Sequence, residues 1–289
     1  MAEGEVYRQG WTPDEISWSA FDPSVVESWL LVAVKAAALV EYNAPDYVTY
    51  LKRVFHDAGP ELHAYIEDWG REESQHGKVL GRWAEMADPG FNLEEAIARF
   101  RKGYKPAHFG ESDNTMSVRG SRRGEMIARC VVESGTSSYY SAIKDASKEP
   151  VLREIAGRIA ADEFRHYKLF FETFQKQDEP DLPFWRKLLI AASRVTESDD
   201  DEISFAYYCA TVRPDEEASK PYDRAYCSKR AFQISLRVYR RQHIQKLTRM
   251  VAKAIGADPN GSLARLAGAL IWRMMRLRAG ILTTAEAPV

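Results

Sequence analysis

The stretches DWGREESQHGKVL (68–80) and ADEFRHYKLFF (161–171) share one arrangement: two adjacent acids, two further residues and a histidine. In each stretch a glutamate lies three residues before the histidine. At about 100° per residue, these two side chains share one face of a helix. A single Glu-x-x-His pair is a weak signal, because with 42 acidic residues among 289, roughly one of the six histidines would have such a neighbour by chance.

The frame around each pair strengthens the signal, because a further glutamate precedes each pair at nearly the same distance. Glu41 lies 32 residues before Glu73, and Glu133 lies 30 residues before Glu163. Such a spacing joins the middle of one long helix to the middle of the next, and two antiparallel helix pairs make a four-helix bundle. The side chains expected to meet at one depth of that bundle are Glu41, Glu73, His76, Glu133, Glu163 and His166.

Four carboxylates and two imidazoles buried together require compensating charge, since unpaired charges are too costly in a core. Two divalent cations would neutralise the four glutamates, and this oxygen and nitrogen ligand set suits iron or manganese. The pattern is that of di-iron carboxylate bundles, so we expect two iron ions, with manganese or a mixed Mn/Fe centre also compatible. Glu72 is rotated away from the face that Glu73 and His76 share, so it is either a polar neighbour or, at most, a residue that supports a ligand from outside.

Helical periodicity dominates the rest of the chain, and no convincing strand alternation is present. Pro45 should interrupt the first helix, and Asn92 should cap a short one. Residues 103–121 are predicted to form a loop and residues 197–202 a polar link. The predicted helices span about 25–55, 60–87, 92–100, 122–146, 150–177 and 184–194, with further helices to about 279.

The motifs around the cluster resemble those of the soluble acyl-carrier-protein desaturases. IAADEFRH (159–166) is similar, nearly letter for letter, to that family's second metal-ligand helix, and WGREESQHG (69–77) is similar to the first. EYNAPDY (41–47) keeps the spacing of glutamate, proline and tyrosine, and ESGT (133–136) keeps a threonine three residues after the glutamate. The resemblance covers about residues 25–178, and the chain beyond that range shows no such match.

The resemblance implies roles for residues beside the predicted ligands. Glu73 and Glu163 would bridge the two metals. Thr136 would lie on the oxygen-binding side and help to supply protons, although a hydroxyl there can also serve helix packing through a bond to the preceding turn. Asp162 would accept a hydrogen bond from a ligand imidazole. Trp69 would join that network as a route for incoming electrons, or else be a core residue.

The implied activity is oxygen-dependent oxidation of an unactivated C–H bond: desaturation of an acyl chain carried as an acyl-carrier-protein thioester, with a ferredoxin-type electron donor. A related di-iron oxygenase remains an open alternative, whether a hydroxylase, an N-oxygenase or an aldehyde-deformylating enzyme. Iron storage or ferroxidase activity is a third alternative. The extra hundred or so residues after 180 argue against it, because storage proteins are about one bundle long.

The charge distribution suggests where partners would bind. The net charge is −2, yet residues 224–278 contain thirteen Lys or Arg and one acidic residue, Asp258. This segment is either the solvated face of amphipathic helices or a docking surface for acidic acyl carrier protein or ferredoxin. No nucleic-acid-binding motif is present.

Composition places the chain in the cytoplasm, where its three cysteines would stay reduced. No signal peptide is evident, and the most apolar run, WLLVAVKAAALV (29–40), is too short and too charged to span a membrane. A homodimer remains possible on this reasoning.

The fold expected from these observations is all-α: a ferritin-like four-helix bundle with additional C-terminal helices. The expected parts are a mobile N-terminal segment (1–20), the bundle (21–180), additional helices packed on it (181–280) and a mobile tail (281–289).

Overall fold

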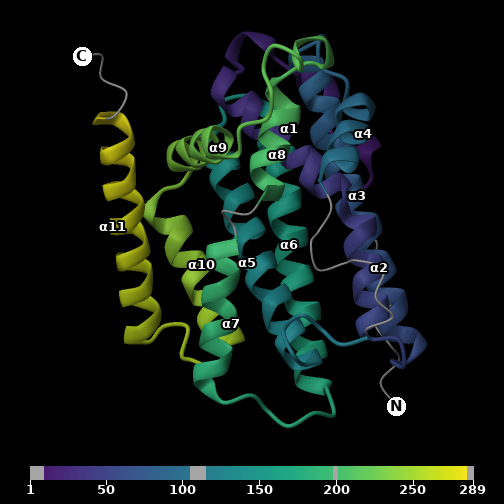
Figure 1. Ribbon diagram of the computed structural model, residues 1–289, viewed down its shortest axis with the longest axis vertical. Coiled ribbons are helices and arrows are strands. Elements are labelled where there is room, and N and C mark those ends of the chain that lie inside the picture. The colour runs from purple at the N-terminus through teal and green to yellow at the C-terminus, as the bar shows by residue number, and fades with distance from the viewer. Residues whose placement is uncertain (1–9, 105–114, 198–200, 285–289) are drawn as a thin grey trace.

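A computed structural model describes residues 10–104, 115–197 and 201–284, and these residues form helices and connecting loops without a strand (Figure 1). The predicted all-α fold is therefore confirmed. The helices are α1 (Ser28–Tyr42), α2 (Ala44–Val54), α3 (Pro60–Ala87), α4 (Leu93–Gly103), α5 (Arg122–Ala146), α6 (Pro150–Lys176), α7 (Phe184–Glu197), α8 (Asp201–Thr211), α9 (Arg224–Val238), α10 (Arg241–Ala254) and α11 (Ser262–Thr284).

Four helices, α1, α3, α5 and α6, contribute the residues of the predicted cluster. α1 packs along α3, α5 packs along α6, and α3 also contacts α6. Gly77 permits the close approach of α1 and α3, because a Cβ there would lie only 2.5 Å from the backbone nitrogen of Tyr42. On the other pair, Ser137 Oγ of α5 donates to the carbonyl oxygen of Ala160 on α6 at 2.8 Å. Small side chains thus let each helix pair bring its polar residues together.

Several helix ends follow the local signals in the sequence. The first predicted helix is interrupted at Asn43, and Pro45 lies in the first turn of α2, where its missing N–H is not needed. Asn92 caps α4 by accepting a hydrogen bond from the Glu95 backbone N–H at 2.9 Å. The predicted interruption and the predicted cap are both confirmed.

Two predicted boundaries are wrong. Asp201 and Glu202, assigned to a polar link, form the first turn of α8, where acidic side chains interact favourably with the helix dipole. The tail predicted as mobile from residue 281 begins too early, because α11 continues to Thr284. One interior glycine, Gly280, costs a helix only about 1 kcal/mol and need not end it. Residues 105–114, 198–200 and 285–289 lie outside the described residues.

Residues 10–20 pack against the bundle, so the mobile segment predicted over 1–20 does not extend across them. Trp11 is only 7% exposed. The Ser17 backbone N–H donates to Glu154 Oε2 at 3.1 Å, and Trp18 Nε1 donates to the Pro13 carbonyl oxygen at 2.8 Å. Burial of large indole rings with their N–H groups satisfied offsets the entropy lost on ordering such a segment. Residues 1–9 lie outside the described part of the chain.

The C-terminal helices lie on one side of the long helices. α7 and α10 pack on α5, α8 packs on α1, and α11 contacts α9 and α10. In Figure 1, α11 lies at the edge of the molecule. Across the described ranges, no helix has both the length and the apolar character needed to cross a bilayer.

Candidate metal centre

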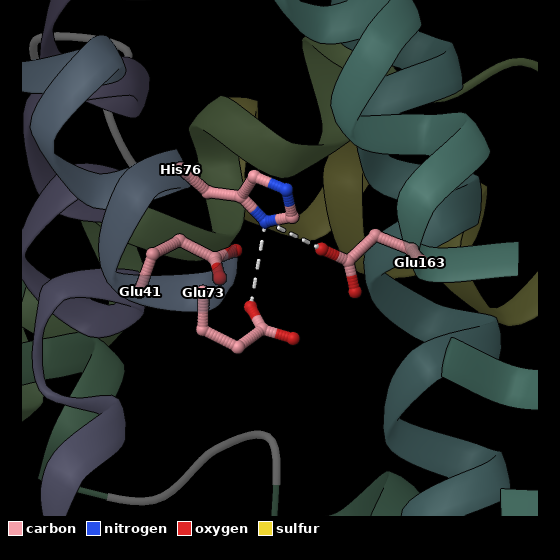
Figure 2. A group of neighbouring side chains, drawn as sticks. All are labelled: Glu41, Glu73, His76 and Glu163. Carbon is pink, nitrogen blue, oxygen red and sulfur yellow. Dashed lines mark ion pairs between the residues drawn. The ribbon is translucent and has the colours of Figure 1, made fainter. Parts of the chain in front are cut away.

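The six residues expected to meet at one depth are brought together in the structure. Each is buried, with between 0% and 8% of its surface exposed. They are Glu41 on α1, Glu73 and His76 on α3, Glu133 on α5, and Glu163 and His166 on α6. Figure 2 shows four of them, with the carboxylate of Glu163 facing the other three across the space between the helices.

The candidate ligand atoms form two groups that share two residues. Glu41, Glu73, His76 and Glu163 make the first group, and Glu73, Glu133, Glu163 and His166 make the second. Within each group, one nitrogen or oxygen from every residue lies within 4.8 Å of the others. Each group therefore offers three carboxylates and one imidazole, and these buried clusters could hold a metal ion.

Buried polar atoms without hydrogen-bond partners support this interpretation. Such atoms cost about 1–3 kcal/mol each and are rare in native proteins. In this cluster they are His76 Nδ1, His166 Nδ1, Glu133 Oε1 and Glu163 Oε1. His76 Nδ1 also lies 3.1 Å from Glu163 Oε1 and 3.5 Å from Glu73 Oε2 (Figure 2). Nitrogen and oxygen atoms that lack hydrogen-bond partners and gather in two buried groups fit bound cations, so the residues present suit a metal ion.

The cluster carries strongly shifted pKa values. Burial raises the pKa of Glu41 and Glu133 well above the usual range, and repulsion from the neighbouring carboxylates adds to this. Burial opposes ionisation of Glu73 as well, but the two histidines beside it outweigh burial and lower its pKa well below the usual range. Burial disfavours the imidazolium forms of His76 and His166, yet the surrounding acids raise the pKa of both histidines well above normal. Without a metal the cluster therefore holds protons, which bound cations would displace.

Each cluster imidazole contacts an acid on the other Glu-x-x-His helix. His76 Nε2 on α3 lies 3.0 Å from Asp162 Oδ2 on α6, and His166 Nε2 on α6 lies 2.6 Å from Glu72 Oε2 on α3. Arg165 joins the two acids, donating to Asp162 Oδ1 at 2.6 Å and to Glu72 at 2.9 Å. With Nε2 held from outside, each Nδ1 faces the cluster, the usual way a ligand imidazole is oriented.

The contact predicted for Asp162 is present, and of the two roles left open for Glu72 the structure shows the supporting one rather than that of a mere polar neighbour. Glu72 does point away from Glu73, but that direction leads to His166 on the facing helix. A signal was available in the sequence, because an acid precedes the candidate ligand glutamate in both motifs. The role of this acid is not evident within one motif, because each acid contacts the histidine of the other motif on the facing helix.

The tryptophan beside this network is Trp11, so the prediction that Trp69 joins the Asp162 network is wrong. Trp11 Nε1 donates to Asp162 Oδ2 at 2.7 Å, and its ring stacks on His76 with centroids 6.1 Å apart. Trp69 instead packs edge-on against Phe170 at 5.6 Å, and its Nε1 has no hydrogen-bond partner. Trp69 therefore belongs to the apolar core. Trp11 lies 151 residues from Asp162, in a segment without a helical pattern, so sequence reasoning had no signal for this contact.

Two hydroxyl groups of α5 contact the carboxylates. Thr136 Oγ1 lies 2.7 Å from Glu163 Oε2, closer than the two carbonyl oxygens of its preceding turn at 3.2 and 3.3 Å. A hydroxyl has one proton to donate, so the shortest contact assigns it to Glu163. Tyr140 donates to Glu41 Oε1, a contact that sequence reasoning missed. Its position seven residues after Glu133, on the same helix face, was the available signal.

Removing either outer acid should weaken metal binding. We expect Asp162→Asn and Glu72→Gln each to lower metal affinity by about 10–100-fold, because each variant loosens the orientation of one imidazole. Competition with a chelator of known affinity measures the change. Asp68→Asn is the matched control, since Asp68 lies on α3 but pairs with Arg71 rather than with a histidine. An unchanged affinity for Glu72→Gln would contradict the assignment of Glu72.

No protein-family model matches this chain, and a search of curated proteins finds no significant match. The likeness to the desaturases therefore depends on the motifs around the cluster.

Proposed function

We propose that the cluster binds two iron ions and that the protein is an oxygen-dependent oxidase acting on an unactivated C–H bond. The proposed substrate is an acyl chain carried on acyl carrier protein, and the proposed reaction is desaturation of that chain. The observation that carries this proposal is the sharing of Glu73 and Glu163 by the two ligand groups. Two carboxylates common to both groups allow a close metal pair, as in di-iron carboxylate bundles. When bound, such a pair supplies the oxygen activation and hydrogen abstraction that side chains cannot. Manganese or a mixed Mn/Fe centre is compatible with the same ligands.

The residues of this chain would divide the remaining tasks. Glu41 with His76, and Glu133 with His166, would complete the ligands of the two ions. The acids behind the imidazoles hold these rings in place, and burial of the whole cluster excludes water from the reaction. Thr136, with its hydroxyl 2.7 Å from Glu163, holds a proton at the edge of the cluster where it can be delivered.

The reaction also needs electrons and a presented substrate. We assign these to a ferredoxin-type donor and to acyl carrier protein, both acidic partners. The support is the excess of thirteen basic residues over one acidic residue in 224–278, the segment that forms α9, α10 and most of α11. A field of one sign steers oppositely charged partners toward a surface.

A polar substrate is a second candidate, and one observation favours it. Arg129, one helical turn before Glu133, is buried, and its Nε lies 3.4 Å from Glu125 Oε1. Its guanidinium lies over the ring of Tyr47, and Tyr50 donates to Glu125 at 2.7 Å. An entirely apolar chain gains little beside such buried polar groups. A related oxygenase, whether a hydroxylase, an N-oxygenase or an aldehyde-deformylating enzyme, would suit this surrounding.

Activity should depend on oxygen, iron and Thr136. With reduced ferredoxin and acyl-carrier-protein thioesters of several chain lengths, mass spectrometry should detect acyl chains that have lost two hydrogens. Thr136→Ala should lower the rate by about 100-fold, the usual scale for a positioned proton donor. Thr211→Ala is the control, because Thr211 is a helical threonine whose hydroxyl bonds only to backbone carbonyls. A product that has gained oxygen would favour the second candidate, and no oxidation of any chain by iron-loaded protein would contradict desaturation.

A further inference from the structure

The outer face of α11 carries a row of exposed apolar side chains with arginines on either side of it. The apolar residues are between 45% and 69% exposed, which is unusual for large apolar side chains in a row. At about 100° per residue they fall within a sector of about 80° and extend over about 21 Å of helix. We call these residues the α11 stripe, and they are Leu263, Leu266, Leu270, Met274 and Leu277.

The opposite face of α11 is packed, so the direction of the α11 stripe is settled by the fold. Ala264 is 3% exposed. Gly268 lies against α10, where an added Cβ would come within 2.9 Å of Thr248 Oγ1. With its inner face held this closely, α11 cannot rotate to bury the stripe. The α11 stripe therefore faces outward at the edge of the molecule seen in Figure 1.

The charged residues of α11 and of the helices packed on it are of one sign. α9 and α10, which contact α11, carry basic residues and no acidic residue. Relative to the direction of Leu270, Arg273 lies about 60° to one side and Arg278 about 80° to the other. Both arginines are exposed, so guanidinium groups border the stripe on its two sides. α11 itself has no acidic residue and four arginines, which are Arg265, Arg273, Arg276 and Arg278.

We propose that the α11 stripe binds the surface of an anionic lipid membrane, with α11 lying in the plane of the interface. Helices that carry leucines on one face and basic residues beside them bind membranes in this way, with the apolar face inserted about 5–10 Å deep. The arginine stems lie along apolar surface while their guanidinium groups reach the lipid phosphates. α11 would lie on the bilayer rather than cross it, because no helix in the described ranges is long and apolar enough to span one.

The flanking arginines favour a lipid surface over a second copy of the chain. Two copies of α11 packed along their stripes would bring like-charged flanks together, with no acid on either helix to pair with them. A lipid surface instead presents negative phosphates on both sides of the helix. The position of α11 at the edge of the molecule also suits a fluid interface, which yields around inserted side chains, whereas a protein partner would need a matching groove.

This inference goes beyond the proposed function, and it depends neither on the metal centre nor on the substrate. Nine of the thirteen basic residues in 224–278 precede α11. Basic residues on α9 and α10 therefore remain for a ferredoxin-type donor or acyl carrier protein. Because α11 packs on α10, attachment through the α11 stripe would also fix which side of the protein is turned to the bilayer.

The first test measures sedimentation with vesicles at low salt. The wild type should sediment with vesicles of phosphatidylglycerol and phosphatidylcholine in equal parts, and should stay in solution with phosphatidylcholine alone. Leu270→Glu should lower the affinity about 10–100-fold, with helix content and bound metal unchanged, because a charge replaces an inserted leucine. Leu189→Glu is the matched control and should bind like the wild type, since Leu189 on α7 is 60% exposed and Leu270 is 59% exposed.

The second test separates charge from apolar insertion. Arg273→Gln should weaken binding to the anionic vesicles about five-fold, the scale on which one basic residue near an anionic surface contributes. Arg273→Lys keeps the charge and should bind like the wild type. Added salt should weaken binding by the wild type and reduce its advantage over Arg273→Gln, because salt screens exposed charges.

The third test measures insertion and does not rely on an added charge. Leu270→Cys carrying a polarity-sensitive fluorophore should shift its emission to the blue when anionic vesicles are added, because the probe enters an apolar region. The same fluorophore on Leu189→Cys should show no shift. Labelling is selective because the native cysteines are buried, and these are Cys130, Cys209 and Cys227.

Two results would overturn the proposal. Wild-type protein that stays in solution with anionic vesicles at low salt would exclude a lipid surface. If that protein were a dimer by light scattering and Leu270→Glu a monomer, the α11 stripe would belong to a second copy of the chain. Equal losses of vesicle binding in Leu270→Glu and Leu189→Glu would show that net charge, and not the α11 stripe, attracts the protein to the vesicles.

Discussion

Glu163→Gln is expected to eliminate binding of both metal ions, whereas Glu41→Gln should spare one of them. Glu163 belongs to both ligand groups, and Glu41 belongs only to the group that contains His76. Loss of a shared carboxylate removes charge and a ligand from two sites at once. Loss of an unshared one leaves the second group with all four of its residues. Glu133→Gln should behave like Glu41→Gln, but at the other site.

The metal content per chain distinguishes these outcomes. Elemental mass spectrometry measures it after each variant has been purified and reloaded with iron. Glu172→Gln is the matched control, because Glu172 is an exposed glutamate on the same helix as Glu163. Full metal occupancy in Glu163→Gln would contradict the ligand assignment altogether. Loss of a single ion in every variant would instead contradict the shared role of Glu73 and Glu163.

Removal of the metals should lower the unfolding temperature by about 10 °C. Binding at a thousand times the dissociation constant stabilises a folded protein by about 4 kcal/mol, and each kcal/mol shifts the midpoint of a chain of this size by about 2–4 °C. The physical cause is the cluster itself, in which carboxylates and imidazoles are buried together. Without cations, the carboxylates and imidazoles can compensate the charge of the cluster only by holding protons.

The difference in unfolding temperature between the metal-loaded and the metal-free protein should widen as the pH rises from about 5 to 8. Glu41 and Glu133 have raised pKa values in the folded protein, caused first by burial, and His76 and His166 have raised values because of the acids around them. A group with a raised folded pKa stabilises the protein fully below its unfolded pKa and loses that contribution as the pH passes its folded pKa. The metal-free protein should therefore lose stability across this window.

Groups with lowered pKa values do not reverse this trend. Burial opposes ionisation of Glu73 but is outweighed by the histidines, and its pKa falls well below the usual range of a glutamate. Its stabilising contribution is lost only as the pH falls through that low value, which is outside the window. Calorimetry of both forms at several pH values, with a Glu172→Gln control, measures the effect. A metal-free protein that gains stability from pH 5 to 8 would contradict the buried, metal-compensated cluster.

The helical fold and the six clustered residues could be predicted from sequence because their signals are local and periodic. Pro45 and Asn92 act on their own helix ends, and Glu73 and His76 share a helix face whatever that face packs against. Contacts across large separations had no such signal. Trp11 reaches Asp162 from a segment without helical periodicity, and Trp69, for which a network role and a core role were both open, lies in the apolar core.

The sequence by itself determined which residues line one face of each long helix, because helical geometry converts spacing into direction. Only the tertiary structure decided how those faces are supported. The packing of α3 against α6 pairs Glu72 with His166 and Asp162 with His76, and Trp11 stacks on the ring of His76. The tertiary structure also leaves Leu270 exposed on the outer face of α11, since α10 packs on the other side of that helix. These outcomes depend on which helices pack against which, and that is set by the summed burial of the whole chain rather than by any one motif.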